Sequence, residues 1–356
     1  MSKIENKTNP GNFFEDFSVG QELIHSTPRT ITPGDVSLFI GLLGSRFVLH
    51  SSNEFAKKIG YKSSPVDDIL TFNMVFGKTV PDISLNSPAN LGYASCKFGV
   101  PVYVGDTIKT ISKVLGVKEN SNKKTGIVWV NSIGKNQKNE VVLDYVRWVM
   151  VNKKDKSSLA PKIVIPDLKT EVDNSEFYIP KDLNISNYNF DESGSIYIWD
   201  DYKVGEKIDH VDGMTIEESD HMTATRLYQN TAKVHFNEHT EKDGRLGRRI
   251  VYGGHIISLV RMLSFNGLNN AFRILAINGG KHIAPTVAGD TIYAWTEILD
   301  KKELSNNPGV GVLRLKTIGV KNHLCKEFPL YKNGDVEYNS NVVLEIDYSV
   351  LIPKKL

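Results

Sequence analysis

An internal repeat constrains the fold of this chain more than any other feature of its sequence. Residues 14–36 read FEDFSVGQELIHSTPRTITPGDV, and residues 199–221 read WDDYKVGEKIDHVDGMTIEESDH, which aligns with the first segment without a gap at an offset of 185 residues. The same offset places His50 on His235. Self-similarity at a fixed spacing indicates copies of one structural unit. His50 and His235 therefore occupy equivalent positions in the two copies, and the role of one bears on the role of the other.

The repeat continues to the end of the chain. PVYVGDTI at 101–108 matches PTVAGDTI at 285–292, and VVLDYVRWVMV at 141–151 matches VVLEIDYSVLI at 342–352. The offset is 201 residues for the last pair, so about 16 additional residues lie in the final hairpins of the second copy. We therefore expect an N-terminal repeat, a polar and Pro-containing linker, and a C-terminal repeat, at residues 1–151, 152–195 and 196–356.

Both copies share one order of predicted elements. In the first, Thr32 is placed to cap a short amphipathic helix that has Pro33 at its first position and runs through Leu43. A loop with the histidine follows, then a longer helix, then strands rich in Val, Ile, Tyr and Trp. The apolar residues expected on the buried faces of the longer helices are Ile69, Phe72 and Phe76, and Ile256, Leu259, Val260 and Leu263. A long helix followed by an antiparallel sheet, twice, predicts an α+β fold.

Composition excludes several classes of partner. With 40% hydrophobic and 24% charged residues, the 356-residue chain has the balance of a globular protein. Its net charge of +2 comes from scattered lysines, so we expect no nucleic-acid partner. The N-terminus has no apolar signal region, and no run of about 18 uncharged apolar residues occurs. We therefore expect a cytoplasmic protein without membrane contact.

Cofactor and metal motifs are missing from the sequence. No G-x-G-x-x-G motif follows a predicted strand, and there is no P-loop and no zinc-ligand spacing. Cys96 and Cys325 are too few for a disulfide framework or a zinc cluster, and we expect both to be small buried hydrophobes. The sequence predicts neither a cofactor nor a metal site.

The second copy reads NTAKVH at 230–235 and IVYG at 250–253. These segments resemble the MaoC-type hydratase family, whose members carry a D-x-N-P-x-H loop and then an I-V-H-G stretch at the start of the long helix. The resemblance covers nearly the whole chain and implies a double hot-dog fold, in which each sheet wraps a long helix and the two sheets join edge to edge. DDILTFNMVFGKTVPDISLNSPANLGYA and LYQNTAKVHFN are most similar to the mesaconyl-CoA hydratase branch, also called β-methylmalyl-CoA dehydratase.

What the resemblance implies is reversible hydration of an enoyl-CoA thioester, most simply mesaconyl-CoA to β-methylmalyl-CoA, by a homodimer that needs no cofactor because coenzyme A is part of the substrate. Water must lose a proton as it attacks C3, and imidazole is the side chain best suited to accept it near neutral pH. Negative charge builds on the thioester oxygen, and unpaired N–H groups at a helix N-terminus would stabilise it.

The two copies differ at the start of the long helix. The second has Tyr252, Gly253 and Gly254 there, whereas the first has Asp67 and Asp68 at the positions of Tyr252 and Gly253. Glycine leaves room for a thioester against the backbone, and a carboxylate would repel the developing enolate. A carboxylate at this position also stabilises a helix and needs no other role. We expect the active site in the second copy, with His235 as its acid/base and Gly253 and Gly254 at the oxyanion site.

One position departs from the family pattern. Asn230 stands where the acidic partner of the histidine is expected, and Ser45 is its equivalent in the first copy. An amide can orient water but cannot accept its proton. Either His235 transfers the protons alone, or a carboxylate assists it, and those nearest in sequence are Glu238, Asp243 and Asp220. Asn230 could equally cap a turn.

Substrate contacts are expected from residues near this loop. Gln229 with Asn230 could fix the water or a substrate carboxylate, and Tyr252 and His50 are further candidates. Because a mesaconyl group carries a second carboxylate, a cation should face it. The cations nearest the site in sequence are Arg226, Lys233, Arg248, Arg249 and, from the first copy, Arg46.

Two other functions fit the same sequence. A hot-dog thioesterase would use a carboxylate beside the long helix to activate water, and Asp67 or Asp68 would supply it. A noncatalytic acyl-CoA-binding protein would explain Asn230, although it would not explain why His235 is kept beside Gly253. Hydrolysis releases free thiol and hydration does not, so the products distinguish these alternatives.

Overall fold

The computed structural model describes residues 7–244, 246–332 and 336–355. In these residues the strands of the first repeat are β1 (Glu22–Thr30), β2 (Ala89–Phe98), β3 (Thr107–Glu119), β4 (Thr125–Lys135) and β5 (Val141–Asn152). Those of the second are β6 (Lys207–Asp209), β7 (Met214–Thr215), β8 (Arg273–His282), β9 (Thr291–Glu303), β10 (Val310–Lys321) and β11 (Val342–Pro353).

All of these strands belong to one sheet. Its order is β1-β3-β4-β5-β2-β8-β11-β10-β9-β6, with β7 also pairing with β9. The two halves of this order mirror each other around the antiparallel β2–β8 pair, in which Tyr93 lies opposite Gly280 and Lys97 opposite Ala276. The predicted α+β double hot-dog fold, with its two sheets joined edge to edge, is confirmed. The additional residues of the second copy lie mainly between β10 and β11.

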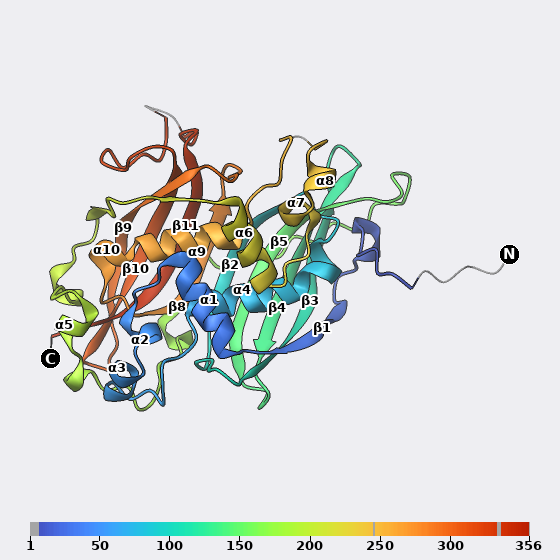
Figure 1. Ribbon diagram of the computed structural model, residues 1–356. Helices are drawn as coiled ribbons and strands as arrows, with labels where there is room; N and C mark the ends of the chain where they lie inside the picture. The colour runs from blue at the N-terminus through green and yellow to red at the C-terminus, as the bar shows by residue number, and fades with distance from the viewer. Residues whose placement is uncertain (1–6, 245, 333–335, 356) are drawn as a thin grey trace.

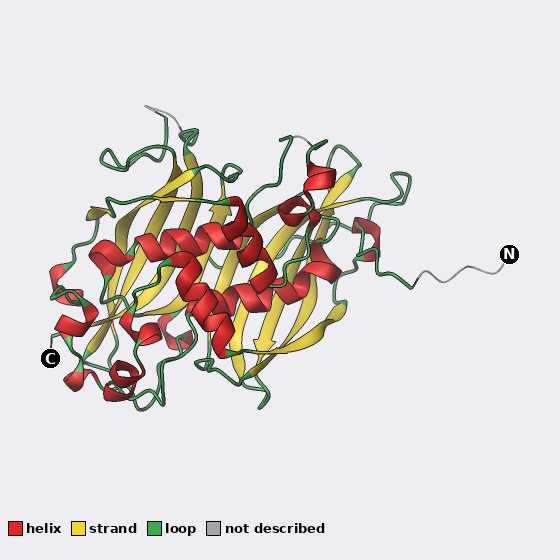
Figure 2. Ribbon diagram, in the orientation of Figure 1, coloured by secondary structure: helices red, strands yellow, loops and turns green. Residues whose placement is uncertain are grey.

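The helices lie on one face of the sheet (Figures 1 and 2). Those of the first repeat are α1 (Pro33–Leu43), α2 (Val48–Ser51), α3 (Asn53–Lys58) and α4 (Asp68–Thr79), which continues into a π-helical turn at Val80–Ser84. Those of the second are α6 (Glu218–Leu227), α7 (Lys233–Phe236), α8 (Glu238–Glu241), α9 (Gly253–Leu263) and α10 (Phe265–Leu268). The short 3-10 turns Phe14–Asp16 and Trp199–Asp201 open the two repeats at equivalent positions.

Helix α1 forms where its capping signals predict. The Thr32 side chain accepts a hydrogen bond from the Asp35 backbone N–H, and the Asp35 carboxylate accepts one from the Thr32 backbone N–H. This reciprocal pair satisfies two donors that the first turn would otherwise leave unpaired. Gly44 ends the helix with φ of 60°, a conformation that glycine adopts without a steric penalty.

The core of the protein lies between the sheet and the two long helices, α4 and α9. The apolar faces expected from the sequence are buried, including Ile69 and Phe72 on α4 and Ile256 and Leu259 on α9. The two helices contact each other at Asn73, whose amide nitrogen donates to the Ser258 hydroxyl oxygen at 3.1 Å. One core therefore spans both repeats.

The segment between the repeats wraps over the structure. It contains short helical turns at Asn174–Glu176 and Ile185–Asn187 and the four-residue helix α5 (Phe190–Ser193). The Val172 backbone N–H donates to the Asn278 side-chain oxygen at 3.0 Å. Its apolar residues pack on a second buried cluster, through Phe177, Ile179, Leu183, Ile185 and Phe190. The segment is therefore ordered by apolar burial.

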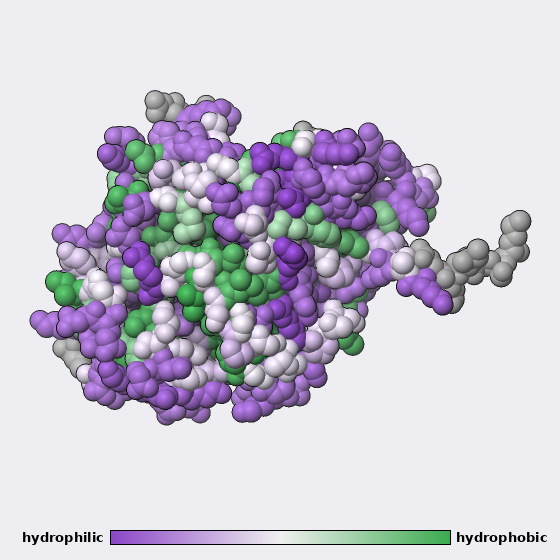
Figure 3. Space-filling view, viewed as in Figure 1, coloured by the Kyte–Doolittle hydropathy of each residue, from purple (hydrophilic) through white to green (hydrophobic). Residues whose placement is uncertain are grey.

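The helix-bearing surface is hydrophilic around its edge and carries hydrophobic side chains near its centre, over the helices (Figure 3). Both cysteines are free and buried, as the sequence predicts. In the described part of the chain, none of the helices has the length and apolar character needed to span a membrane.

Candidate active site

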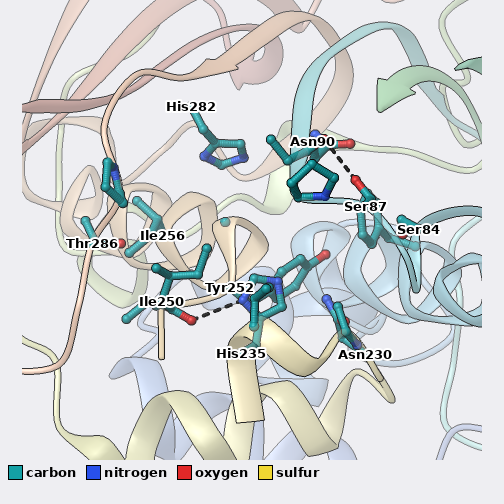
Figure 4. A pocket seen from close by; sticks show the side chains of 18 of the residues that line it. Ser84, Ser87, Asn90, Asn230, His235, Ile250, Tyr252, Ile256, His282 and Thr286 are labelled. Atoms are coloured by element: carbon teal, nitrogen blue, oxygen red, sulfur yellow. Dashed lines mark hydrogen bonds between the residues drawn. The ribbon is translucent and has the colours of Figure 1, made fainter. Parts of the chain in front are cut away.

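A pocket of about 240 Å³ lies between the two repeats. The second repeat lines it with the loop around His235, with the start of α9 and with the end of β8, and the first repeat lines it with α4, β2 and β5. Figure 4 shows His235, Asn230 and Tyr252 gathered on one side of this pocket, with Ser84, Ser87 and Asn90 from the first repeat beside them. Three of the four predicted catalytic residues line it, namely Asn230, His235 and Gly253.

His235 lies on α7 and is held by the backbone. Its Nδ1 is 3.1 Å from the Ile250 carbonyl oxygen, and because a carbonyl only accepts, Nδ1 carries the proton. The second nitrogen, Nε2, then has the free lone pair. Burial lowers the pKa of His235 to about 4, so the imidazole is neutral at physiological pH. A neutral imidazole with Nε2 unprotonated is a competent general base.

The N-terminus of α9 adjoins this imidazole. Tyr252 is the N-cap residue, its ring centroid is 5.4 Å from that of His235, and Gly253 is the first helical residue. The first backbone N–H groups of a helix have no intrahelical acceptor and carry the positive end of the helix dipole. A Cβ atom at position 253 would lie 2.5 Å from the ring of His282, so only glycine fits here without movement.

Asn230 and Tyr252 contribute polar groups. The Asn230 side-chain oxygen accepts a hydrogen bond from the Ala232 backbone N–H at 3.0 Å, which caps the turn before α7. Asn230 therefore caps a turn and lines the pocket at once. The Tyr252 hydroxyl is buried without a hydrogen-bond partner among the described residues. Burial raises the pKa of Tyr252 well above its usual range, so the hydroxyl stays protonated and can donate.

The sequence analysis did not anticipate several pocket residues, among them His282, Tyr93 and Arg147. His282 ends β8, and its Nε2 lies 3.2 Å from the Tyr93 hydroxyl across the β2–β8 junction. Burial lowers the pKa of His282 to about 4. A histidine at the end of a strand carries no pattern that predicts a pocket. Arg147 was predictable, because it interrupts an otherwise apolar alternation along β5.

The equivalent location in the first repeat is closed. His50 Nδ1 lies 3.1 Å from the Pro65 carbonyl oxygen, which reproduces the His235 contact at the repeat spacing. However, His50 Nε2 faces the Asp68 carboxylate at 3.9 Å. The carboxylate also accepts a hydrogen bond from the Ile274 backbone N–H at 2.8 Å and interacts with the charge of Arg273. Protein groups thus occupy the position that the pocket has in the second repeat.

The remaining predicted catalytic residue, Gly254, and the other predicted substrate-binding residues lie outside the pocket around His235. Gly254 packs on α4, where a Cβ atom would lie 2.0 Å from the Asn73 side-chain oxygen. Gln229 accepts a hydrogen bond from Lys78 and lines a neighbouring pocket together with Arg226. Lys233 is exposed, and the exposed Arg46 stacks on the Phe265 ring. His50 is buried at the closed location in the first repeat.

Neither the expected cations nor the expected carboxylates reach this pocket. Arg248 and Arg249 pair with Glu218 on the surface. Glu238 pairs with Arg249, and Asp220 and Asp243 do not line the pocket. Among the described residues, the pocket lining contains no aspartate or glutamate. His235 and His282 are its two imidazoles.

The sequence matches a family model described as mesaconyl-CoA hydratase over residues 2–334. It is 58% identical over 349 residues to a β-methylmalyl-CoA dehydratase from Chloroflexus aurantiacus, with 98% of this chain and 99% of the relative covered. It is 50% identical over 348 residues to a mesaconyl-CoA hydratase from Cereibacter sphaeroides, with 98% of this chain and 100% of the relative covered.

The protein is also similar to solved structures. A MaoC domain protein dehydratase from Chloroflexus aurantiacus superposes with a TM-score of 0.96 at 57% identity, covering 99% of this chain and 100% of the other. A double-hotdog protein from Mycobacterium tuberculosis superposes with a TM-score of 0.77 at 21% identity, covering 97% of this chain and 99% of the other. The second likeness supports the fold alone.

Proposed function

Because this chain belongs to the mesaconyl-CoA hydratase family, we propose that the pocket around His235 catalyses the reversible addition of water to mesaconyl-CoA, which yields β-methylmalyl-CoA. The chain is a hydro-lyase that acts on a CoA thioester. One observation carries the assignment of the site. A neutral imidazole and the N-terminus of a buried helix line the same pocket.

His235 acts as the proton carrier in this proposal. Its Nε2 takes a proton from water as the oxygen attacks C3, and the resulting imidazolium gives a proton to C2. The hydroxyl and hydrogen of one water are thereby added across the double bond. Because no carboxylate among the described residues lines the pocket, a single imidazole carries both transfers. One proton carrier on one face of the alkene predicts syn addition.

The helix α9 stabilises the enolate. As water attacks C3, electrons move to the thioester oxygen, which becomes negatively charged. Placed against Gly253, this oxygen meets the unpaired N–H groups and the positive dipole end of α9. The Tyr252 hydroxyl and the Asn230 amide are further donors in the pocket.

Substrate binding also tunes the base. The pKa of about 4 for His235 belongs to the unliganded pocket, where burial disfavours the cation. An anionic substrate beside the ring favours the imidazolium and raises the pKa toward neutrality. The bound substrate therefore strengthens the base at the moment that it is needed.

The thioesterase alternative lacks a carboxylate in the pocket. Asp67 caps α4 by accepting a hydrogen bond from the Ile69 backbone N–H at 2.8 Å, and Asp68 is bound by Ile274 N–H. Both carboxylates therefore have structural partners. The homodimer, the cytoplasmic location and the lack of a cofactor stay predictions from the sequence.

The test is an assay of the purified protein with mesaconyl-CoA, crotonyl-CoA and a saturated acyl-CoA, in which enoyl absorbance and free thiol are followed together. We expect the absorbance of mesaconyl-CoA to fall without release of thiol. Release of thiol from the saturated thioester would instead identify a thioesterase, and no change in either signal would leave a binding protein.

A further inference from the structure

Arg147 occupies an unusual position for a cation. It lies in the middle of β5 on the face that packs against α4, and its side chain is fully buried. The neighbouring positions on this face are apolar or aromatic and equally buried, namely Leu143, Tyr145, Val149 and Val151. Arginine is almost never buried to this extent without a charged partner.

The partners of Arg147 are neutral. One terminal nitrogen, Nη2, donates to the Thr79 hydroxyl oxygen at 2.7 Å, and the remaining contacts, to Ser84 and Asn90, are 3.4 to 3.5 Å long. The guanidinium carbon lies 4.2 Å from the Phe76 ring centroid. Among the described residues, no carboxylate forms an ion pair with Arg147, and its Nε has no hydrogen-bond partner. A buried charge without a counter-ion is costly to fold.

Arg147 lines the pocket of His235, and other unsatisfied donors line it too. The side-chain nitrogen of Asn90 and the hydroxyl of Tyr252 are buried without partners in the described part of the chain, as is Arg147 Nε. Three donors without acceptors thus belong to residues that line one cavity, and such groups are normally paired. An acceptor that enters with a ligand would pair them, and beside a guanidinium an anion is the favoured acceptor.

The fold itself does not require a cation at this position. In the repeat alignment, Arg147 falls on Tyr348 of β11. Tyr348 is buried on the equivalent strand, and its hydroxyl lies 3.0 Å from the Thr317 hydroxyl. A neutral side chain thus fills the same place in the second repeat, so the charge in the first repeat needs another explanation.

We propose that Arg147 binds the free carboxylate of a dicarboxylic enoyl-CoA substrate and thereby selects it over monocarboxylic thioesters. This inference rests on the proposed function and adds the residue that determines its substrate class. With the thioester oxygen at Gly253 and the carboxylate at Arg147, the alkene lies between two fixed ends and presents one face to His235. The first repeat supplies specificity, and the second supplies the chemistry.

The experiment compares Arg147→Gln with the wild type on mesaconyl-CoA and crotonyl-CoA. We expect the ratio of kcat/KM for mesaconyl-CoA to that for crotonyl-CoA to fall about 100-fold or more, because the substrate carboxylate loses its charged partner. Arg147→Lys keeps the charge but not the planar fork, so it should recover part of the ratio. A structural role would lower both activities together and leave the ratio unchanged.

Arg261 provides the matched control. It is also buried, stacks on an aromatic ring at 3.7 Å and lies outside this pocket. Arg261→Gln should lower the melting temperature without changing the substrate ratio. An unchanged ratio in Arg147→Gln, with wild-type turnover of mesaconyl-CoA, would overturn the inference alone. A wild-type protein that hydrates neither thioester would overturn the proposed function first.

Discussion

The two repeats hold their equivalent histidines in the same way and differ in the residues beside them. His50 and His235 donate from Nδ1 to equivalent backbone carbonyls at the same distance of 3.1 Å. Beyond that contact, the second repeat has Gly253 and a pocket, whereas the first has Asp68 bound to Ile274 N–H. The backbone therefore orients both imidazoles, and the residue that begins the long helix is a glycine in the second repeat and a carboxylate in the first.

The first repeat also lines the pocket. Its strands β2 and β5 and its helix α4 form the opposite wall of the pocket, with Asn90, Tyr93 and Arg147. In the proposed function the two repeats divide one task, with proton transfer by the second and recognition of the acyl group by the first.

Position 253 gives the largest expected effect. Gly253→Asp gives the second repeat the residue that the first repeat has at this position. Its Cβ atom would clash with the His282 ring, and its negative charge would repel the enolate. We expect kcat for mesaconyl-CoA hydration to fall by about 10³-fold or more, beyond the loss of a single oxyanion-hole donor. Gly253→Ala separates the steric effect from the charge. Turnover close to wild type in Gly253→Asp would show that the helix start does not hold the substrate.

A substitution at the equivalent position of the first repeat, Asp68→Asn, should act on stability instead. It removes the charge beside His50 and Arg273, and losing a buried hydrogen-bonded charge costs about 1 to 3 kcal/mol. We expect a lower midpoint in chemical denaturation and kcat within about threefold of wild type. A large loss of kcat with unchanged stability would contradict the structural role given to Asp68.

The pH dependence of kcat/KM should show a smaller effect, which comes from the low pKa of His235. His235 acts as a neutral base with a pKa of about 4 in the free protein, so activity is lost only as pH falls through that value. We expect kcat/KM to be constant from about pH 8 to pH 5 and to fall below, whereas an ordinary histidine would halve it near about pH 6.5. A midpoint near the ordinary value would show that the pocket is solvated.

That profile needs a control for folding. Burial also lowers the pKa of His210 and His282 to about 4 and that of His255 to about 3. Each is neutral in the fold, so its contribution to stability is present above the unfolded pKa of about 6.5 and is lost as pH falls toward the folded value. Initial rates measured after brief pH jumps, with circular dichroism recorded in parallel, separate the loss of the base from acid unfolding.

The fold was predictable because the repeat is strong and local signals agree with it. Thr32, Pro33 and Asp35 specify the start of α1, and the apolar spacing through Phe72 specifies the buried face of α4. The duplication also implies two matching sheets. That the two sheets join edge to edge was available only through the family resemblance. Which edges join, β2 with β8, was not predicted.

The sequence predicted only those pocket residues that lie close together along the chain. His235, Asn230 and Gly253 are close in sequence and reach one pocket. Sequence proximity selected Arg226 and Lys233 as cations, yet a residue that is near a site in sequence can point away from it. Residues from β2, β5 and β8 come together through sheet pairing, which short-range patterns do not encode. The exception is the charged residue within the apolar alternation of β5.

His50 and His235 occupy equivalent positions in the two repeats, and we propose that only His235 takes part in the chemistry. The most direct test of this proposal is the parallel measurement of kcat for His235→Gln and His50→Gln with mesaconyl-CoA, with both variants shown to be folded by circular dichroism. We predict that His235→Gln loses about 10²-fold or more, the usual cost of removing a general acid/base, while His50→Gln stays within about tenfold of wild type. Near wild-type turnover in His235→Gln together with an inactive His50→Gln would place the chemistry in the N-terminal repeat and contradict this account.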